Sequence, residues 1–291
     1  MIPSIIDIAV VPVVIAASIF LPPLLDGVER KIKAIIHSRI GPPILQTWYD
    51  LLKLFGKSIL APRNSLHIMT LILMYAVLSI TTLILFLYGI YCNSLHYVIA
   101  SVALFMMIQA LYLTIPFVTS NPFAAIGLSR EIMIMLINEI AFITAFSLIL
   151  YFTRGIYTWS FYYTVLVIVL LISSYVSSGR IPFDLAEAEP ELASGILIEF
   201  SGPFLGIYHY TSLVKRFLVK IVPSYLVLSL FPLDPYIRVV LVIMFSCILW
   251  LLYATIAPLL GRSRVDIAPS SLLKLYTFLF AVALILFILG L

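Results

Sequence analysis

Acidic side chains in a very apolar chain are the residues best able to do chemistry here. Five carboxylates lie within the 16 residues from position 184 to position 199, in a protein that is 63% hydrophobic and only 10% charged. Acids close to lipid are costly and are usually retained for ion or proton traffic. The stretch RIPFDLAEAEPELASGILIEFSG (180–202) therefore predicts a site that handles protons or cations. Its acids are Asp184, Glu187, Glu189, Glu191 and Glu199.

Three of these acids alternate along the chain, at Glu187, Glu189 and Glu191. In a loop they would all face one aqueous funnel, whereas on a helix they would spread over different faces. Facing one funnel, they would repel one another and bind protons as a coupled group. An acidic loop that is merely solvated is the alternative interpretation.

Two further acids fall within apolar stretches. Glu139 lies about two turns into EIMIMLINEIAFITAF (131–146), where a carboxyl that is kept from water is suited to taking up and releasing protons. Glu199 precedes a stretch that contains Pro203 and two glycines, so a helix there could bend and hold water beside its acid. The structural alternatives are a protonated Glu139 bonded to Asn138 or to a neighbouring helix, and a tight helix contact with an incidental Glu199.

Apolar runs long enough to cross a membrane must position these acids. A transmembrane helix needs about 20 apolar residues. We therefore expect an all-α integral membrane protein of about eight transmembrane helices, with residues 1–291 forming a single polytopic membrane domain. Residues 221–235, which are broken by three prolines, predict a short re-entrant or surface piece. The long apolar runs lie near 4–25, 67–91, 95–118, 131–152, 160–178, 195–218, 236–259 and 271–291.

The basic residues predict an orientation in the cell membrane. Twelve of the 17 Lys and Arg side chains fall on the side of the loop between the first two spans, which the positive-inside rule makes cytoplasmic. The acidic loop, about 179–194, lies on that same side. Lys215, Arg216 and Lys220 fall on the outer side, and we expect them to snorkel from a long tilted helix. Because the charges flank lipid spans, they argue against nucleic-acid binding.

A cytoplasmic segment, about residues 43–57, has the pattern of a two-faced helix. Trp48 and Phe55 fall on an apolar stripe, and Asp50 and Lys53 fall on the opposite one. The pattern predicts an amphipathic helix along the membrane surface. It is either a generic surface anchor or a strut that braces neighbouring helices or docks a soluble partner.

Charged residues at helix ends are candidates for balancing the acids. Asp26 and Glu29 lie at the end of the first span. We interpret them mainly as a helix end that meets lipid headgroups, and ion pairing to the acidic loop is a second role. Arg130 and Glu131 adjoin each other at the cytoplasmic end of another span. The two cysteines and four histidines have no metal-type spacing, so we expect no metal or other cofactor on this chain.

Three of these motifs resemble one family, respiratory complex I subunit 1. The 180–202 stretch is similar to the family signature, and ERKIKAIIHSRIGPPILQTWYDLLKLFGK (29–57) resembles its first loop and amphipathic helix. NPFAAIGLSREIMIMLINEIAFITAF (121–146) resembles its fourth-helix motif, with Glu139 at the buried acid position. The short loop at 41–46 departs from the quinone-reducing branch. It resembles the branch of membrane-bound hydrogenases and sulfane sulfur reductases.

The resemblance implies a membrane subunit, without a catalytic centre of its own, in a multisubunit oxidoreductase complex. It would anchor a cytoplasmic redox module whose iron–sulfur clusters or nickel–iron centre lie on partner chains. It would couple electron transfer to H⁺ or Na⁺ movement by antiporter-like membrane subunits. The implied path runs from the acidic loop through Glu139 and Glu199. Arg39 and Arg180 resemble interface positions that balance the acids.

Other functions stay open from the sequence. The chain could be the quinone-binding subunit 1 of an NADH- or ferredoxin-type quinone reductase. A stand-alone cation or proton transporter also suits acids in helices, although no internal repeat supports an inverted-repeat transporter. A passive scaffold that only anchors the redox arm would leave the acids without function.

Overall fold

The structure is a computed structural model that describes residues 5–59, 65–119, 121–152, 160–184 and 200–290. The described part is all-helical and contains no strand, which confirms the predicted fold class. The long helices are α1 (Ile5–Ile36), α3 (Ser65–Tyr91), α4 (Leu95–Val118), α5 (Pro122–Phe152), α6 (Phe161–Val176), α8 (Gly202–Ser229), α9 (Pro235–Ile256) and α10 (Ala268–Ile288). A short helix, α2 (Gln46–Phe55), follows α1, and the 3-10 turn η2 (Ala257–Leu259) follows α9.

The helices identify a multi-pass membrane protein. In the described residues, α3, α4, α5, α9 and α10 each contain a stretch long and apolar enough to cross a membrane, and α6 is a shorter apolar helix. A membrane core offers backbone groups no water, so helices that satisfy their own hydrogen bonds are the favoured spanning elements. The length and apolar character of the helices do not establish the expected number of about eight spans. α8, which carries three cations, is not among the qualifying helices.

The proline-rich region after position 220 does not form the re-entrant piece that we expected. Residues 202–229 form one continuous helix, α8, with Pro223 inside it and buried. A proline within a helix removes one backbone hydrogen bond and disturbs the carbonyl four residues earlier, yet buried packing retains the helix here. The segment at Lys215 to Lys220 is therefore the middle of a buried helix and not its outer end.

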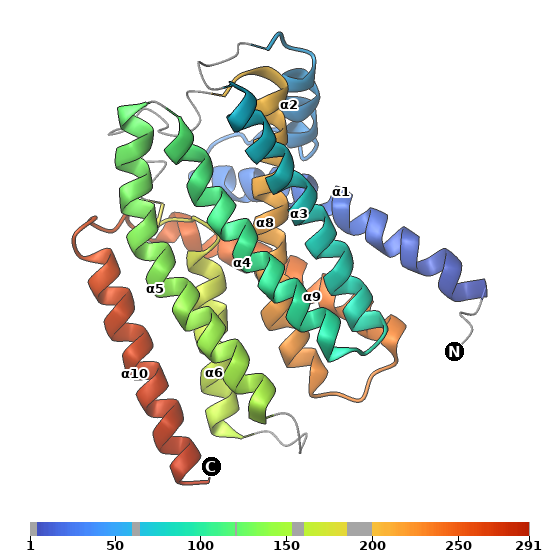
Figure 1. Cartoon of the computed structure of the whole chain (residues 1–291), viewed down its shortest axis with the longest axis vertical. Coiled ribbons are helices and arrows are strands. Elements are labelled where there is room, and N and C mark those ends of the chain that lie inside the picture. Colours follow the sequence, from blue (N-terminus) through green and yellow to red (C-terminus); the bar gives the residue numbers. More distant parts are fainter. Residues whose placement is uncertain (1–4, 60–64, 120, 153–159, 185–199, 291) are drawn as a thin grey trace.

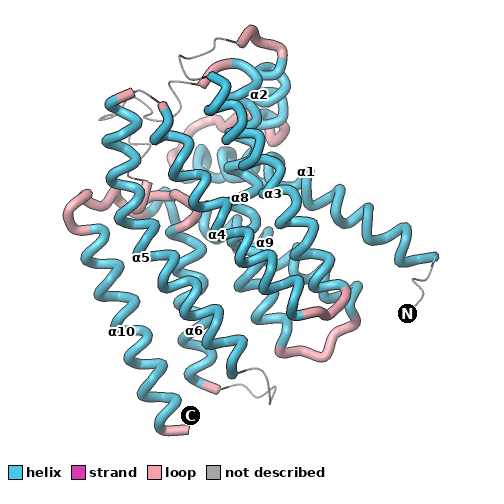
Figure 2. The backbone as a smooth tube through the Cα atoms, viewed as in Figure 1, coloured by secondary structure: helices cyan, strands magenta, loops and turns pink. Residues whose placement is uncertain are grey.

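The helices form a bundle around α8, which packs against α9, α3, α6 and α2 (Figure 1). On one side α3 pairs with α4; on the other α5 pairs with α6, and α10 covers α6. Figure 2 shows the connecting loops gathered at the ends of the long helices, while the N-terminal part of α1 extends away from the bundle. This arrangement puts α8 between the helices that carry the acids.

The segment from Ile44 to Ser58 is held tightly against α1 and α8. A Cβ added at Gly27 of α1 would come within 1.8 Å of the Ile44 carbonyl oxygen. At Gly202, where φ is +57°, a Cβ would lie 2.9 Å from the Ser58 carbonyl oxygen, so only glycine suits this approach. Trp48 also packs on Phe20, with ring centroids 5.4 Å apart. α2 thus packs as a strut between two helices.

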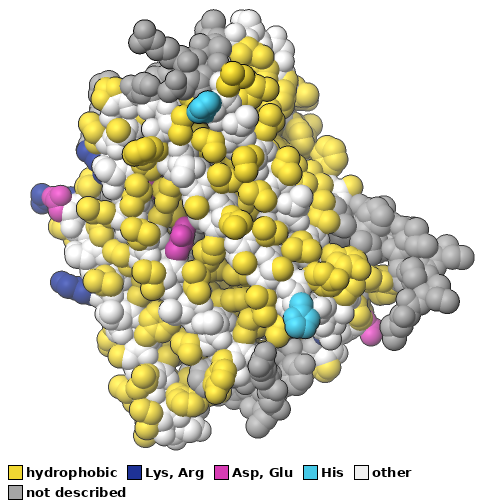
Figure 3. Space-filling view, viewed as in Figure 1, with side chains coloured by type: hydrophobic (Ala, Val, Ile, Leu, Met, Phe, Trp, Pro, Cys, Tyr) yellow, Lys and Arg dark blue, Asp and Glu magenta, His cyan; other side chains and the backbone are white. Residues whose placement is uncertain are grey.

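The outer surface is largely hydrophobic, as Figure 3 shows for the face over α4 and α5. Exposed leucine, isoleucine, methionine and phenylalanine side chains occur along α3, α4, α5, α9 and α10. Such a surface would be unfavourable in water and suits contact with acyl chains. The polar groups that could do chemistry must therefore be sought inside the bundle and at its ends.

Candidate functional site

A buried ion pair joins the end of α1 to the chain that follows α6. Glu29 is 2% exposed and Arg180 is 4% exposed, and an Nη2 of Arg180 donates to Oε2 of Glu29. Lys33, one turn further along α1, lies 2.8 Å from the other Glu29 oxygen. Burial alone would raise the pKa of Glu29, but the charges of Arg180 and Lys33 outweigh it and hold the pKa below its usual value. Glu29 is therefore a carboxylate at neutral pH.

Trp250 of α9 connects this pair to a buried lysine. Arg180 donates to the Trp250 carbonyl at 3.1 Å, and its guanidinium lies 5.3 Å from the centre of the indole ring. The ammonium nitrogen of Lys220 lies 4.4 Å from the same ring. Two cations share one aromatic ring, which offers each of them a cation–π contact.

Lys220 lies at the centre of the bundle and is fully buried. Its Nζ donates to Ser178 Oγ at 2.9 Å and to the Arg216 carbonyl at 2.6 Å. Buried lysine is rare unless its amine is paired. Here it links α8 to the end of α6, where Ser178 and Arg180 stand two residues apart.

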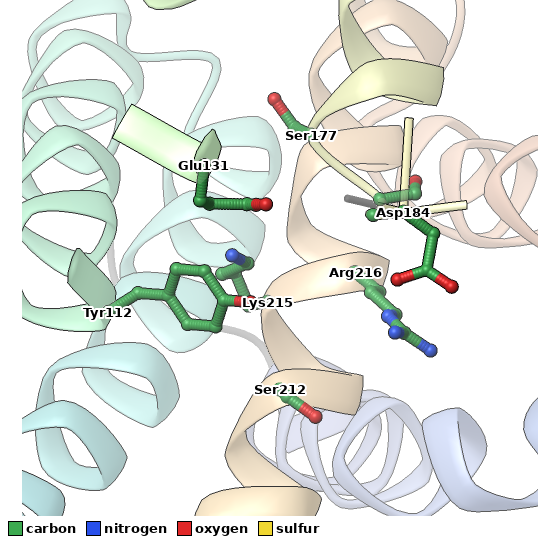
Figure 4. A pocket seen from close by; sticks show the side chains of 9 residues that line it. Tyr112, Glu131, Ser177, Asp184, Ser212, Lys215 and Arg216 are labelled. Carbon is green, nitrogen blue, oxygen red and sulfur yellow. The ribbon is translucent and has the colours of Figure 1, made fainter. Parts of the chain in front are cut away.

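A small polar cavity lies beyond Ser178. Its volume is about 20 Å³, enough to admit about one water molecule. Figure 4 shows Glu131 from α5 and Tyr112 from α4 pointing towards Lys215 of α8, while Arg216 of α8 points to the other side, towards Asp184. Lys215 Nζ lies 3.3 Å from the centre of the Tyr112 ring, and both Lys215 and Glu131 are buried. The lining residues are Tyr112, Glu131, Ser177, Ser178, Gly179, Asp184, Ser212, Lys215 and Arg216.

Asn138 of α5 has its hydrogen bonds to other helices and not to Glu139. Its Nδ2 donates to Ser177 Oγ at 2.7 Å, and its Oδ1 accepts from the Tyr276 hydroxyl at 2.6 Å. Asn138 itself is fully buried. In the described residues no hydrogen bond joins Asn138 to Glu139, so the structure does not support the interpretation in which Asn138 satisfies Glu139.

Glu139 leaves one carboxyl oxygen without a hydrogen bond. Oε1 is buried, and no residue in the described ranges bonds to it. The positive charge that acts on this carboxyl is that of Lys215, which lines the cavity described above. A buried polar group that lacks a partner is costly, so its retention suggests a use. Glu139 as a whole is half-buried, and it does not line that cavity.

A second charged cluster fixes α2 to α1. Arg30 lies 3.0 Å from Asp26 and 2.9 Å from Asp50, and Thr47 donates to Asp26 at 2.9 Å. Gln46 donates to the other oxygen of Asp50 at 2.9 Å. Asp26 therefore bonds to Arg30 and Thr47 and orients α2. Of the two acids, Glu29 is the one that pairs with Arg180.

The predicted acids are only partly brought together in the described residues. Glu187, Glu189, Glu191 and Glu199 lie outside those residues. Asp184 lines the small cavity and lies 3.5 Å from Arg262.

Among the predicted cations, Arg180 is central and the others are peripheral. Arg39 is exposed, and in the described part of the chain no ion pair joins it to an acid. Arg130, the ninth residue of α5, is half-buried beside Glu131. Because Glu187, Glu189, Glu191 and Glu199 lie outside the described residues, the expectation that Arg39 balances the acids stays a prediction.

Three cations of α8 were assigned wrongly from the sequence. Lys215 and Lys220 do not snorkel towards an outer surface, because both are buried and point into the bundle. Arg216 lines the cavity with them. Their position within an apolar stretch could have identified them from the sequence, because cations inside a membrane helix indicate function as acids do. The expected re-entrant piece at 221–235 implies that the preceding helix ends near Lys220, and this is why the three cations were expected at a helix end.

Together these groups form a chain of charged and polar side chains across the bundle. Contacts run from Glu29 through Arg180, Trp250 and Lys220 to Ser178, which lines the cavity together with Lys215. The charge of Lys215 then acts on the half-buried Glu139. Such groups can exchange protons or shift their charges cooperatively. In the described residues no cluster of three His, Cys, Asp or Glu could hold a metal ion.

Comparisons with known proteins point to one family. The family model described as NADH dehydrogenase matches residues 8–289. Formate hydrogenlyase subunit 4 of Escherichia coli (strain K12) is 29% identical over 214 residues, which are 68% of this chain and 70% of that protein. Hydrogenase-4 component C of the same strain is 29% identical over 211 residues, 65% of each chain.

A quinone oxidoreductase component and a solved complex are also similar. NADH-quinone oxidoreductase subunit 8 of Rhodothermus marinus is 25% identical over 245 residues, 75% of this chain and 71% of that protein. A chain in the structure of the membrane-bound sulfane sulfur reductase, an archaeal respiratory membrane complex, superposes with a TM-score of 0.75. It is 21% identical, and the match covers 94% of this chain and 97% of that one, so it establishes the shared fold.

Proposed function

This chain belongs to the NADH dehydrogenase subunit 1 family, and on that premise we propose that it couples a redox module to ion translocation within a membrane complex. The module would bind at the end of the bundle that carries α2 and the end of α6, in the cytoplasm. Its iron–sulfur clusters, and a nickel–iron centre in a hydrogenase-type complex, would lie on partner subunits. Antiporter-like membrane subunits would carry the H⁺ or Na⁺.

The observation that supports this proposal is a line of charged and polar groups that is buried from Glu29 to Lys215 and reaches the half-buried Glu139 through the charge of Lys215. Charges inside a membrane bundle are expensive, and a purely structural scaffold gains little from a buried ion pair that apolar residues could replace. The line begins beside α2, which packs on α1 and α8, and it ends within α5. It therefore offers a physical connection between a partner at the bundle end and groups within the membrane.

The coupling of redox chemistry to ion movement would pass from one charged group to the next along this line. A redox-driven change next to Arg180 would alter its attraction to Glu29 and, through Trp250, the environment of the Lys220 amine. Because Lys220 donates to Ser178, that change reaches the cavity in which Lys215 and Glu131 lie. The charge on Lys215 in turn acts on Glu139. Interacting groups of this kind bind and release protons as a set.

A hydrogenase-type complex is favoured over a quinone reductase. The relatives with 29% identity are hydrogenase and formate hydrogenlyase components, and the 41–46 loop is short. The similarity to a component of an NADH-quinone oxidoreductase supports quinone binding as the second candidate.

Purification in a mild detergent tests the proposal. An affinity tag on this chain should recover iron–sulfur subunits and antiporter-like membrane subunits in constant ratio, with viologen-dependent redox activity in the eluate. Recovery of the chain alone, with cation transport after reconstitution, would instead identify a stand-alone transporter. Added quinone that is reduced by the purified complex would favour the second candidate.

A further inference from the structure

A groove on the membrane-facing surface has the form of a lipid site. Its apolar part has a volume of about 670 Å³ and lies between α4 and α5, where Ala103 and Ser147 supply small side chains. Its polar part has a volume of about 610 Å³ and lies at the α8–α9 connection. Leu95 and Leu150 line both parts, so the polar part adjoins the apolar part.

The length of the apolar part matches one leaflet of a membrane. Along α4 it runs from Leu95 to Met106, which is about 17 Å at 1.5 Å per residue. Half of a hydrocarbon core of roughly 30 Å is about 15 Å. The face that holds this part is the largely hydrophobic surface in Figure 3. The groove would therefore accept one acyl chain lying along the bundle from one membrane surface.

The polar part contains two opposite charges that do not neutralise each other. Arg238 donates to Asn93 Oδ1 at 2.6 Å and to the Leu233 carbonyl at 3.0 Å. Its Nε is buried, and no group in the described ranges accepts from it. Asp234 lines the same cavity, is exposed, and forms no ion pair with Arg238 in the described part of the chain.

We propose that this groove binds a phospholipid with an ethanolamine-type zwitterionic headgroup. The phosphate would accept hydrogen bonds from Arg238, and the ammonium would lie against Asp234. The acyl chain would occupy the space between α4 and α5. A purely anionic headgroup would meet repulsion from Asp234, and a choline headgroup could not donate a hydrogen bond to that carboxylate.

Photolabelling of the intact complex tests this assignment. The complex is reconstituted with phosphatidylethanolamine, phosphatidylglycerol or phosphatidylcholine, each carrying the same diazirine acyl chain. After irradiation, adducts on residues 95–106 and 143–151 are quantified by mass spectrometry. Phosphatidylethanolamine should label these peptides about tenfold more than either other lipid, because charge-assisted hydrogen bonds are worth about 1.5–3 kcal/mol.

Variants separate a headgroup site from ordinary lipid contact. Arg238→Gln should abolish the preference, and Asp234→Asn should raise phosphatidylglycerol labelling to that of phosphatidylethanolamine. Arg264→Gln, on an exposed arginine, should leave the preference intact. Ala103→Phe fills the groove and should lower labelling by all three lipids, whereas Ala281→Phe on exposed α10 should not.

Three results would overturn the assignment. One is equal labelling by all three headgroups in the unchanged protein. Another is a preference that survives both Arg238→Gln and Asp234→Asn. The third is an absence of adducts in the groove, which would indicate that another subunit covers it. Asp234 and Ala103 are exposed, so their variants remain informative even if Arg238→Gln fails to fold.

Discussion

Glu29 and Arg180 stand 151 positions apart in the sequence, and their side chains form an ion pair inside the protein. Each side chain is almost completely shielded, with 3% and 2% of its surface exposed. The pair ties the end of α1 to the segment that follows α6. It also places Arg180 over Trp250, and thereby connects the α2 end of the bundle to Lys220.

Removing one partner of this pair should destabilise the protein strongly. Glu29→Gln leaves the Arg180 charge buried, and such a loss costs about 3–5 kcal/mol. Arg180→Gln should cost a similar amount, while the double variant should cost less than the sum of the two. Thermal unfolding of the purified complex in detergent measures all three. Asp266→Asn, at an exposed ion pair, is the control and should be silent. Additive losses would mean that the two groups do not interact.

The stabilisation by Glu29 should depend on pH in one direction. Its pKa in the folded protein lies below the ordinary value, because Arg180 and Lys33 outweigh the effect of burial. Because the pKa is lowered by folding, the stabilisation is complete above the pKa of the unfolded chain, about 4.3. It is lost as the pH falls through the pKa of the folded protein. The stability difference between the unchanged protein and Glu29→Gln should therefore be constant near neutrality and shrink below about pH 4. A difference that grows on acidification would contradict this assignment.

Replacing Lys220 should separate coupling from stability. Lys220→Met removes a fully buried amine but keeps an apolar chain of similar length, so unfolding should change little or shift upwards. Ion translocation per electron should fall, because the link from Trp250 to Ser178 is lost. Lys274→Met, on exposed α10, is the matched control. If Lys220→Met pumps as well as the control, Lys220 has only a packing role.

The attachment of α2 should be sensitive to a single methyl group. In Gly27→Ala the added carbon would meet the Ile44 carbonyl oxygen at 1.8 Å, which forces the chain before α2 away from α1. We expect a lower unfolding temperature and faster proteolysis between residues 40 and 59. Gly261→Ala is the control, since no atom lies within 4 Å of its added carbon. Equal behaviour of the two variants would show that this close approach is absent in the complex.

The sequence alone was sufficient for the fold class and for the family, because span length and the 121–146 and 180–202 motifs are local properties. It also identified Glu29, Glu139 and Arg180 as candidates. It could not show that Glu29 pairs with Arg180, since residues 151 positions apart meet only through tertiary packing. The prolines near position 223 wrongly predicted a helix end there, so the burial of Lys215 and Lys220 was not predicted. Pro223 was tolerated because buried packing on both sides retains the helix.

The most direct test of coupling is the number of ions moved per electron in the Glu139→Gln variant. Vesicles that contain the complex would be driven by reduced methyl viologen, and H⁺ and ²²Na⁺ uptake would be recorded together with electron transfer. We expect electron transfer to continue while ion uptake per electron falls to the level of vesicles treated with an ionophore, with Asp266→Asn behaving as the unchanged complex. Ion uptake per electron that is the same in Glu139→Gln and in the unchanged complex would contradict a role for the buried charged line in translocation.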